Sequence, residues 1–149
     1  MRYYCTLFLR SDKKDAPSVV FLPAAIRTLD LDDSRSVANL AQAQRFRTIG
    51  FIRRSDLPRY VWYLDSREGV STDVSDPYVH VSWLFSQLKP GFLFASVVNQ
   101  GIESSLGFYW GGNGTGGGPF ISPKLAELLV CHQIGLDVGF YYEEVTGAA

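Results

Sequence analysis

A glycine-rich segment between Gly111 and Gly118 has the clearest potential for chemistry in this chain. It contains the Gly-x-Gly-x-x-Gly spacing of a dinucleotide-binding loop, and Asp137 follows at a spacing typical of an acid that binds ribose. Such a loop needs its last glycine to open a helix, so that the helical amides point at the phosphates. Here residues 119–121 come before the predicted helix, and Asp137 falls inside a predicted strand. The residues therefore favour a surface loop over a nucleotide site.

A cluster of arginines is the second candidate, and aromatic residues lie between its members: Arg45, Arg47, Arg53, Arg54 and Arg59. Cations and aromatic rings together suit a surface that binds nucleic acid through phosphates and stacked bases. However, the net charge of −1 gives no global field that would attract nucleic acid. Charges on edge strands also serve to block aggregation between sheets. The cluster is therefore a candidate contact surface, with nucleic acid as the second choice behind a protein partner.

The histidines and cysteines give little support for metal or nucleophilic chemistry. His80 and His132 lie on different predicted helices, and the chain has no Cys-x-x-Cys or His-x-x-x-His spacing. Cys131 and His132 are adjacent on a helix, so their side chains point about 100° apart. We expect both histidines to be core or boundary residues, and Cys5 and Cys131 to be buried, reduced thiols. The residues predict no catalytic set, no metal site and no cofactor.

Aromatic residues on predicted strands form the third candidate surface. Successive residues of a strand point to opposite faces, so an aromatic pair turns one ring away from the main core. Tyr and Trp supply much of the energy of protein interfaces, because they bury a large area at low entropic cost. We therefore predict a partner-binding surface that includes Tyr109, Trp110 and Tyr141 together with the arginine cluster.

The composition is that of one globular domain. The chain has 149 residues, of which 46% are hydrophobic and 14% are aromatic, well outside the range of disordered proteins. No run of residues approaches the roughly 18 apolar positions of a transmembrane helix. The N-terminal residues alternate and lack a cleavage site, so they predict a strand instead of a signal peptide. We predict a single α+β domain over residues 1–149 that is cytoplasmic and has no membrane partner.

The elements that would position the candidate residues alternate between strands and helices. Period-two patterns predict strands over residues 2–10, 46–52, 59–65 and 105–110. Apolar stripes predict helices over residues 21–29 and 77–88. Residues 92–98 fit a short helix or a strand, and the Asn-Gln-Gly that follows favours the helix.

The C-terminal segment predicts a complete helix, turn and strand. Ser122 can cap the helix, Pro123 fits its first turn, and Gly135 can supply the left-handed residue that ends it. Apolar residues then alternate over 136–142. The order β-α-β-β-α-(α)-β-α-β indicates an α+β fold, with a mainly antiparallel sheet and helices packed on one face. We expect a ferredoxin-like or duplicated ferredoxin-like arrangement.

Taken in order, these elements resemble a known family. The features that carry the resemblance are the Trp62 strand, the helix from Pro77 to Leu88-Lys-Pro, the Phe-Tyr-Trp strand that ends at Trp110, and the Ile-Ser-Pro-x-Leu helix that leads into Gly-Leu-Asp-Val-x-Phe-Tyr-Tyr. The chain is similar to the bacterial domain-of-unknown-function family 4279. Members of that family end in a Ser-Pro-x-Leu helix and a Leu-Asp-x-x-x-Tyr strand. Residues 32–45 depart from the pattern and look like an insertion, and the family brings no established catalytic residues.

By analogy with small bacterial domains of this kind, we expect a soluble protein-binding domain. Its most concrete version is an immunity or antitoxin-type protein that neutralises a toxin by direct binding. One alternative is a nucleic-acid-binding accessory domain that uses the cluster between Arg45 and Arg59. The other is a small-ligand or nucleotide binder that uses the loop between Gly111 and Gly118.

Overall fold

A computed structural model describes residues 2–14, 27–30, 59–96, 100–112 and 117–142 of the chain. The strands in these residues are β1 (Arg2–Ser11), β2 (Arg27–Asp30), β3 (Tyr60–Asp65), β4 (Glu103–Gly112) and β5 (Leu136–Tyr142). The helices are α4 (Pro77–Ser86) and α5 (Pro123–His132), and the 3-10 turns are η1 (Ser66–Glu68) and η2 (Phe94–Ser96). The predicted strand over 46–52 and most of the predicted helix over 21–29 lie outside the described residues.

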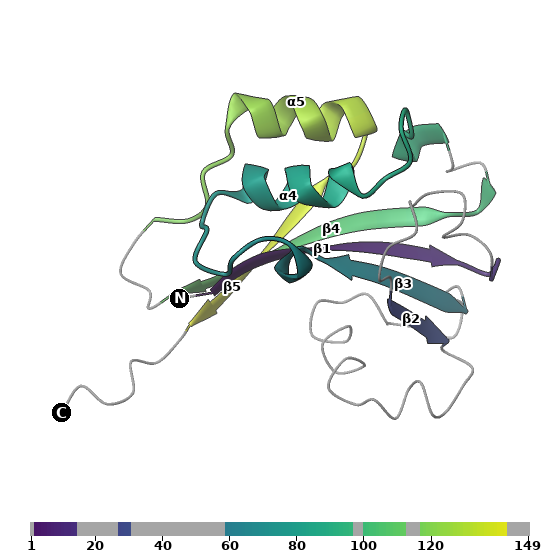
Figure 1. The fold of residues 1–149 in the computed structure, drawn as a ribbon, viewed down its shortest axis with the longest axis horizontal. Helices are drawn as coiled ribbons and strands as arrows, with labels where there is room; N and C mark the ends of the chain where they lie inside the picture. The colour runs from purple at the N-terminus through teal and green to yellow at the C-terminus, as the bar shows by residue number, and fades with distance from the viewer. Residues whose placement is uncertain (1, 15–26, 31–58, 97–99, 113–116, 143–149) are drawn as a thin grey trace.

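The described strands form one sheet, with the order β2-β3-β1-β4-β5 (Figure 1). β1 pairs antiparallel with β3 and β4, β2 pairs antiparallel with β3, and β5 pairs parallel with β4. The chain is therefore α+β with a mixed, mostly antiparallel sheet, as the sequence predicted. The ferredoxin-like order stays a prediction, because predicted elements between β1 and β3 lie outside the described residues.

The central strand, β1, is buried on both faces of the sheet. Tyr3, Cys5 and Leu7 point to the face that packs in the main core, which we call the helix face. Tyr4 and Phe8 alternate with them on the opposite face, which we call the far face, and both are also buried. A strand that is covered on both sides reads as a nearly continuous apolar run, and β1 has that pattern.

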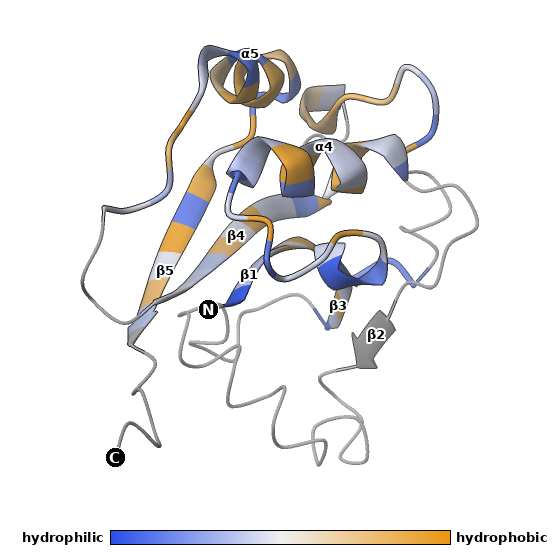
Figure 2. Ribbon diagram, turned by 60° about the vertical axis from the view of Figure 1, so that its left-hand side comes forward, coloured by the Kyte–Doolittle hydropathy of each residue, from blue (hydrophilic) through white to orange (hydrophobic). Residues whose placement is uncertain are grey.

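Helices α4 and α5 lie on the same side of the sheet (Figures 1 and 2). At the start of α4, the side chain of Asp76 accepts a hydrogen bond from the Tyr78 backbone N–H at 2.9 Å. His80, Val81 and Leu84 then face inward and are buried. This helix confirms the predicted apolar stripe. None of the described helices is long and apolar enough to cross a bilayer.

Helix α5 begins as predicted but ends differently. Ser122 Oγ accepts a hydrogen bond from the Leu125 N–H at 3.2 Å, which confirms the cap. The left-handed residue at the C-terminus is Gln133, with φ 52°, and the prediction of Gly135 in this role was wrong. The Ile134 N–H donates to the Leu129 carbonyl at 3.0 Å. This bond closes a Schellman motif, and burial of Ile134 supplies the apolar contact that commonly accompanies it.

Two further predictions about local structure were wrong in part. Residues 27–29 lie in β2 instead of a helix, because they pair with β3 from Arg27 opposite Tyr63 onward. Of the predicted helix over 92–98, residues 92–96 are described, and they contain only the single turn η2, with Phe94 buried. Gly91 has a φ of 74° just before this segment, so the chain turns sharply there and only a short turn follows.

Contact between Gly69 and Trp83 fixes α4 against the turn that follows β3. A Cβ atom on Gly69 would lie 2.0 Å from Nε1 of the Trp83 indole and 2.1 Å from its Cε2. The ring therefore packs on the bare backbone of Gly69, and only glycine leaves it room. Trp83 in turn packs against the main core.

We predict that Gly69→Ala lowers the free energy of unfolding by about 1–3 kcal/mol, because the indole must move out of its packed position. Urea denaturation followed by tryptophan fluorescence measures the change. Gly117→Ala is the matched control, since a Cβ atom there would meet nothing within 4 Å. Equal stability of the two variants would contradict the packing argument.

Candidate functional site

The predicted arginine cluster is represented in the described residues by Arg59 alone. Arg45, Arg47, Arg53 and Arg54 lie outside them. The Arg59 backbone N–H donates to Asp12 Oδ1 at 2.9 Å, and its guanidinium carbon lies 5.0 Å from the centre of the Tyr60 ring. Arg59 therefore lies immediately before β3, and this hydrogen bond from its backbone to Asp12 holds it there.

Two of the predicted partner-binding residues, Tyr109 and Tyr141, lie together on the far face. Their ring centres are 4.2 Å apart, and the ring planes are inclined by 16°. Tyr4 stacks on the other side of Tyr109, at 4.6 Å and 12°. We call Tyr4, Tyr109 and Tyr141 the tyrosine row. It crosses β1, β4 and β5, and Tyr109 and Tyr141 keep part of their surface exposed.

The tyrosine row ends against a cation at its β1 side. The guanidinium carbon of Arg67 lies 4.0 Å from the centre of the Tyr4 ring. Asp65 holds this guanidinium through two hydrogen bonds, from Nε to Oδ1 at 3.0 Å and from the terminal nitrogen to Oδ2 at 2.5 Å. Asp65 Oδ1 also accepts the Arg67 backbone N–H at 2.9 Å. Arg67 is thus positioned by its own turn and neutralised locally.

Gly139 makes room for the other end of the row. It lies beside Tyr109 in the pairing of β4 with β5, on the same face of the sheet. A Cβ atom on Gly139 would lie 2.9 Å from Cε2 of Tyr141. The Tyr141 ring therefore leans back over the glycine and reaches the Tyr109 ring. A glycine in a strand often marks such a close approach.

Trp110, the third predicted aromatic, does not join this group. It neighbours Tyr109 in β4 and so points to the helix face, where its ring centre is 4.6 Å from that of Tyr3. It also lies 6.2 Å from Phe108 and packs against the main core. The structure therefore places Trp110 on the opposite side of the sheet from Tyr109 and Tyr141.

The glycine-rich segment has the features that counted against a nucleotide site. Gly111 and Gly112 belong to β4, and residues 113–116 lie outside the described residues. The helix that follows begins after Ser122, so residues 119–122 separate the last glycine, Gly118, from the helical amides. Asp137 lies within β5, opposite Gly107.

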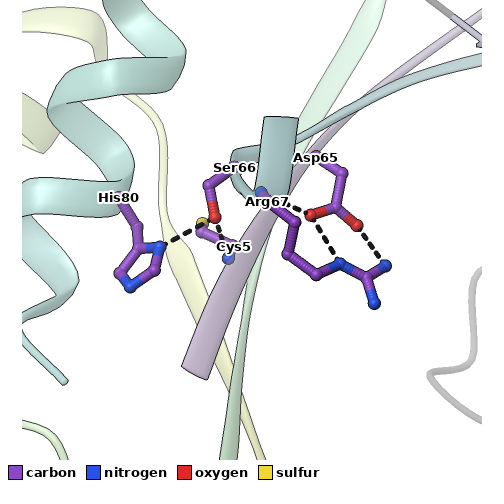
Figure 3. Close-up of polar contacts among 5 residues, drawn as sticks. All are labelled: Cys5, Asp65, Ser66, Arg67 and His80. Carbon is purple, nitrogen blue, oxygen red and sulfur yellow. Dashed lines mark hydrogen bonds and ion pairs between the residues drawn. The ribbon is translucent and has the colours of Figure 1, made fainter. Parts of the chain in front are cut away.

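A buried hydrogen-bond network between β1, η1 and α4 was not predicted from the sequence (Figure 3). The Cys5 backbone N–H donates to Ser66 Oγ at 2.8 Å, and Ser66 Oγ lies 2.8 Å from Nδ1 of His80. On its other side, Nε2 of His80 lies 2.6 Å from the Val74 carbonyl oxygen. A carbonyl only accepts, so Nε2 carries the proton and Nδ1 accepts from the Ser66 hydroxyl. We call Cys5, Ser66 and His80 the buried network.

The buried network has a nucleophile beside a base but not the surroundings of a catalytic site. Ser66 and His80 are both 0% exposed. Both nitrogens of the imidazole are engaged, and the one remote from Ser66 bonds a backbone carbonyl where a catalytic set would place a carboxylate. Burial also raises the pKa of the Cys5 thiol and lowers the pKa of His80. These groups therefore brace the fold.

A signal for this network was present in the sequence. His80 lies four residues before Leu84 and next to Val81, so it belongs to the apolar stripe of α4. A histidine on such a stripe needs a polar partner inside the protein. The identity of that partner, Ser66, depends on how η1 packs, which no local pattern gives.

His132 and Cys131, at the end of α5, have different surroundings. His132 is half-buried, with ring centres of Phe85 and Phe94 at 4.3 and 5.5 Å. Burial lowers its pKa as well. Cys131 is exposed, so the prediction of a buried thiol was wrong at this position, whereas Cys5 is buried and both thiols are free. Among the described residues, no group of three or more His, Cys, Asp or Glu side chains could hold a metal ion.

Comparison with known proteins adds no assignment. The chain matches no protein-family model, no curated protein and no solved structure. Any function must therefore be inferred from the described residues themselves, above all from the tyrosine row.

We predict that Ser66→Ala lowers the free energy of unfolding by about 1–3 kcal/mol, because it leaves buried polar groups of Cys5 and His80 without their partner. Ser105→Ala is the matched control. Its hydroxyl oxygen is buried without a hydrogen-bond partner, so its removal should be neutral or stabilising. Chemical denaturation of both variants tests the network, and a smaller loss for Ser66→Ala than for Ser105→Ala would contradict it.

Acid should destabilise the protein through His80. Burial lowers its folded-state pKa below the ordinary value of 6.5, so the unfolded chain takes up the proton first as the pH falls. The contribution of His80 to the free energy of unfolding is therefore complete above about pH 6.5. It decreases as the pH falls from there to the folded-state pKa of His80. His80→Gln should flatten this decrease, and His132→Gln should remove a smaller part. Denaturation midpoints at neutral pH and at mildly acidic pH measure both effects, and an unchanged pH dependence in His80→Gln would refute the assignment.

Proposed function

We propose that this chain is a small soluble protein-binding domain that acts by covering the surface of a partner. The observation that supports this most directly is the tyrosine row. Tyr109 and Tyr141 were expected to bind a partner from their residue type, and they lie 4.2 Å apart as one partly exposed aromatic surface. Tyr4 stacks on Tyr109, and Arg67 lies over the Tyr4 ring, so both residues stabilise the position of this surface.

The row suits protein binding because its side chains are ordered before any partner arrives. Stacking confines each ring to one orientation, so little side-chain entropy remains to be lost on binding. Large aromatic groups that enter an interface in this way commonly dominate its energy. The phenolic hydroxyl adds a polar group at the end of an apolar ring, which is useful at a boundary between protein and water.

The same geometry argues against the nucleic-acid alternative. A base stacks on the open face of an aromatic ring. In the row, the faces of Tyr109 are taken by Tyr4 and Tyr141, so the ring offers its edge. Arg67, whose guanidinium lies over the Tyr4 ring, is bound to Asp65 and is already neutralised. A central ring that offers only its edge, beside an arginine already paired with a carboxylate, favours a protein partner.

The most concrete form of this function is that of an immunity or antitoxin-type protein, which neutralises a toxin by direct binding. Such a protein needs a preformed surface and no reactive group of its own. The resemblance to the bacterial domain-of-unknown-function family 4279 supports a bacterial domain of this kind. We also propose that it acts in the cytoplasm, which the free thiols of Cys5 and Cys131 support.

We predict that Tyr141→Ala weakens partner binding by about 30-fold or more, the size expected of an interface hot spot. Wild-type and variant proteins are used to capture binding proteins from host cells, and the affinity of each purified partner is then measured by calorimetry. Val130→Ala is the control, because Val130 is 74% exposed but lies on α5, away from the far face. A captured toxin should also lose its toxicity when it is co-expressed with the wild-type chain.

Two results would contradict the proposal. One is a partner that binds wild type and Tyr141→Ala equally well. The other is retention on a polynucleotide column that weakens steeply with salt and depends on Tyr141, which would support the nucleic-acid alternative.

A further inference from the structure

The two edges of the described sheet differ in how well they are protected. β2 forms one edge with only four residues, and its sequence begins and ends with a charge, Arg27 and Asp30. Short, charged edge strands resist pairing with other sheets. β5 forms the other edge with seven residues, Leu-Asp-Val-Gly-Phe-Tyr-Tyr, and Asp137 is its one charge. This strand has no lysine and no proline, so its sequence does not protect the edge.

Apolar surface is exposed on the same strand. Phe140 points to the helix face, in register with Trp110, yet it remains 65% exposed. A Cβ atom on Gly118 would lie 3.2 Å from Cε1 of its ring, so the backbone before α5 passes close beside it. Val138, on the same face of β5, is half-buried and packs against the main core. An exposed apolar side chain on an unprotected edge strand leaves that edge open to pairing with another strand.

We propose that the outer edge of β5 pairs with the β5 of a second copy of this chain. The two strands run antiparallel about a two-fold axis at Gly139, the middle residue of the strand. In this register, Val138 of each copy lies opposite Phe140 of the other, and Asp137 lies opposite Tyr141. The pairing keeps the helix layers of both copies on one face of a continuous sheet, because opposed residues in antiparallel strands point to the same side.

The strand is complementary to itself in this register, which is why we choose a second copy as the occupant. The single charge, Asp137, never meets its own copy and instead lies opposite Tyr141, which carries no like charge. Phe140 gains an apolar neighbour on the helix face. At the axis, where a residue must face itself, the chain has Gly139, which has no side chain to clash. A two-fold interface requires this kind of self-complementarity.

This inference goes beyond the proposed function. The pair would present two tyrosine rows on one continuous far face. Partner binding does not depend on the pairing, since each copy carries a complete row. The two proposals can therefore fail separately.

Sedimentation velocity of the full chain over a wide concentration range tests the pairing. The wild type should dimerise with rising concentration, and Phe140→Lys should raise the dimer dissociation constant by about 30-fold or more, as at an interface hot spot. Val130→Lys is the matched control, since it also replaces an exposed apolar side chain with lysine but lies on α5, and it should dimerise as the wild type does. Circular dichroism checks that both variants remain folded. A monomeric wild type at every concentration, or a dimer that Phe140→Lys leaves intact, would overturn the proposal.

Disulfide trapping tests the register. In a Cys131→Ser background, the double variant Asp137→Cys with Tyr141→Cys places cysteines directly opposite each other in the two copies, within the range that a disulfide spans. It should form a covalent dimer on mild oxidation. Asp137→Cys alone is the control, because the two copies of residue 137 are then far apart along the strands. Equal cross-linking of the single and double variants would overturn the two-fold axis at Gly139. Loss of partner binding in Tyr141→Ala, measured on monomer, would still support the proposed function.

Discussion

One hydroxyl group joins the centre of the sheet to the layer above it. β3 ends at Asp65, which lies opposite Thr6 of β1. The residues of β1 that precede Thr6 therefore have no partner from β3. Ser66 Oγ takes the next backbone donor, the N–H of Cys5, and hydrogen-bonds to His80 of α4. The Thr72 carbonyl then accepts a further N–H of β1. Because a buried donor without a partner is costly, the turn after β3 must take this conformation.

The same turn also prepares the far face. Ser66 and Arg67 are successive residues, but they act on opposite sides of β1. Ser66 points inward to His80, whereas Arg67 lies over the Tyr4 ring, where Asp65 holds it. The turn η1 therefore positions side chains in both the core and the tyrosine row. A change that loosens η1 should disturb both, even though the row lies on the opposite face of the sheet from α4 and α5.

The sequence predicted the elements where the signal is local. Ser122 before α5 and the apolar residues that mark β1 and β5 as strands need only their neighbours in the chain, and the structure confirms them. The end of α5 depends on burial of Ile134 after a left-handed Gln133, so the nearby glycine was a misleading signal. The buried network joins residues 14 positions apart through the packing of α4 on η1, and the order of residues alone does not specify that packing. The tyrosine row was only half predicted, because stacking depends on strand register.

β5 carries the two surfaces on which the functional argument depends, and its connection explains why. It follows β4 through α5 and runs parallel to it, as strands joined by a helix do. A hairpin partner would have covered the outer edge of β5. The chain instead reaches β5 through α5, and none of the described strands pairs with that edge. Gly139 matters to both surfaces. Because it has no side chain, Tyr141 can lie over its backbone, and no side chain projects from the middle of the edge strand. Replacing this glycine by a larger residue would therefore act on the row and on the edge together, whereas a change at Phe140 acts on the edge alone.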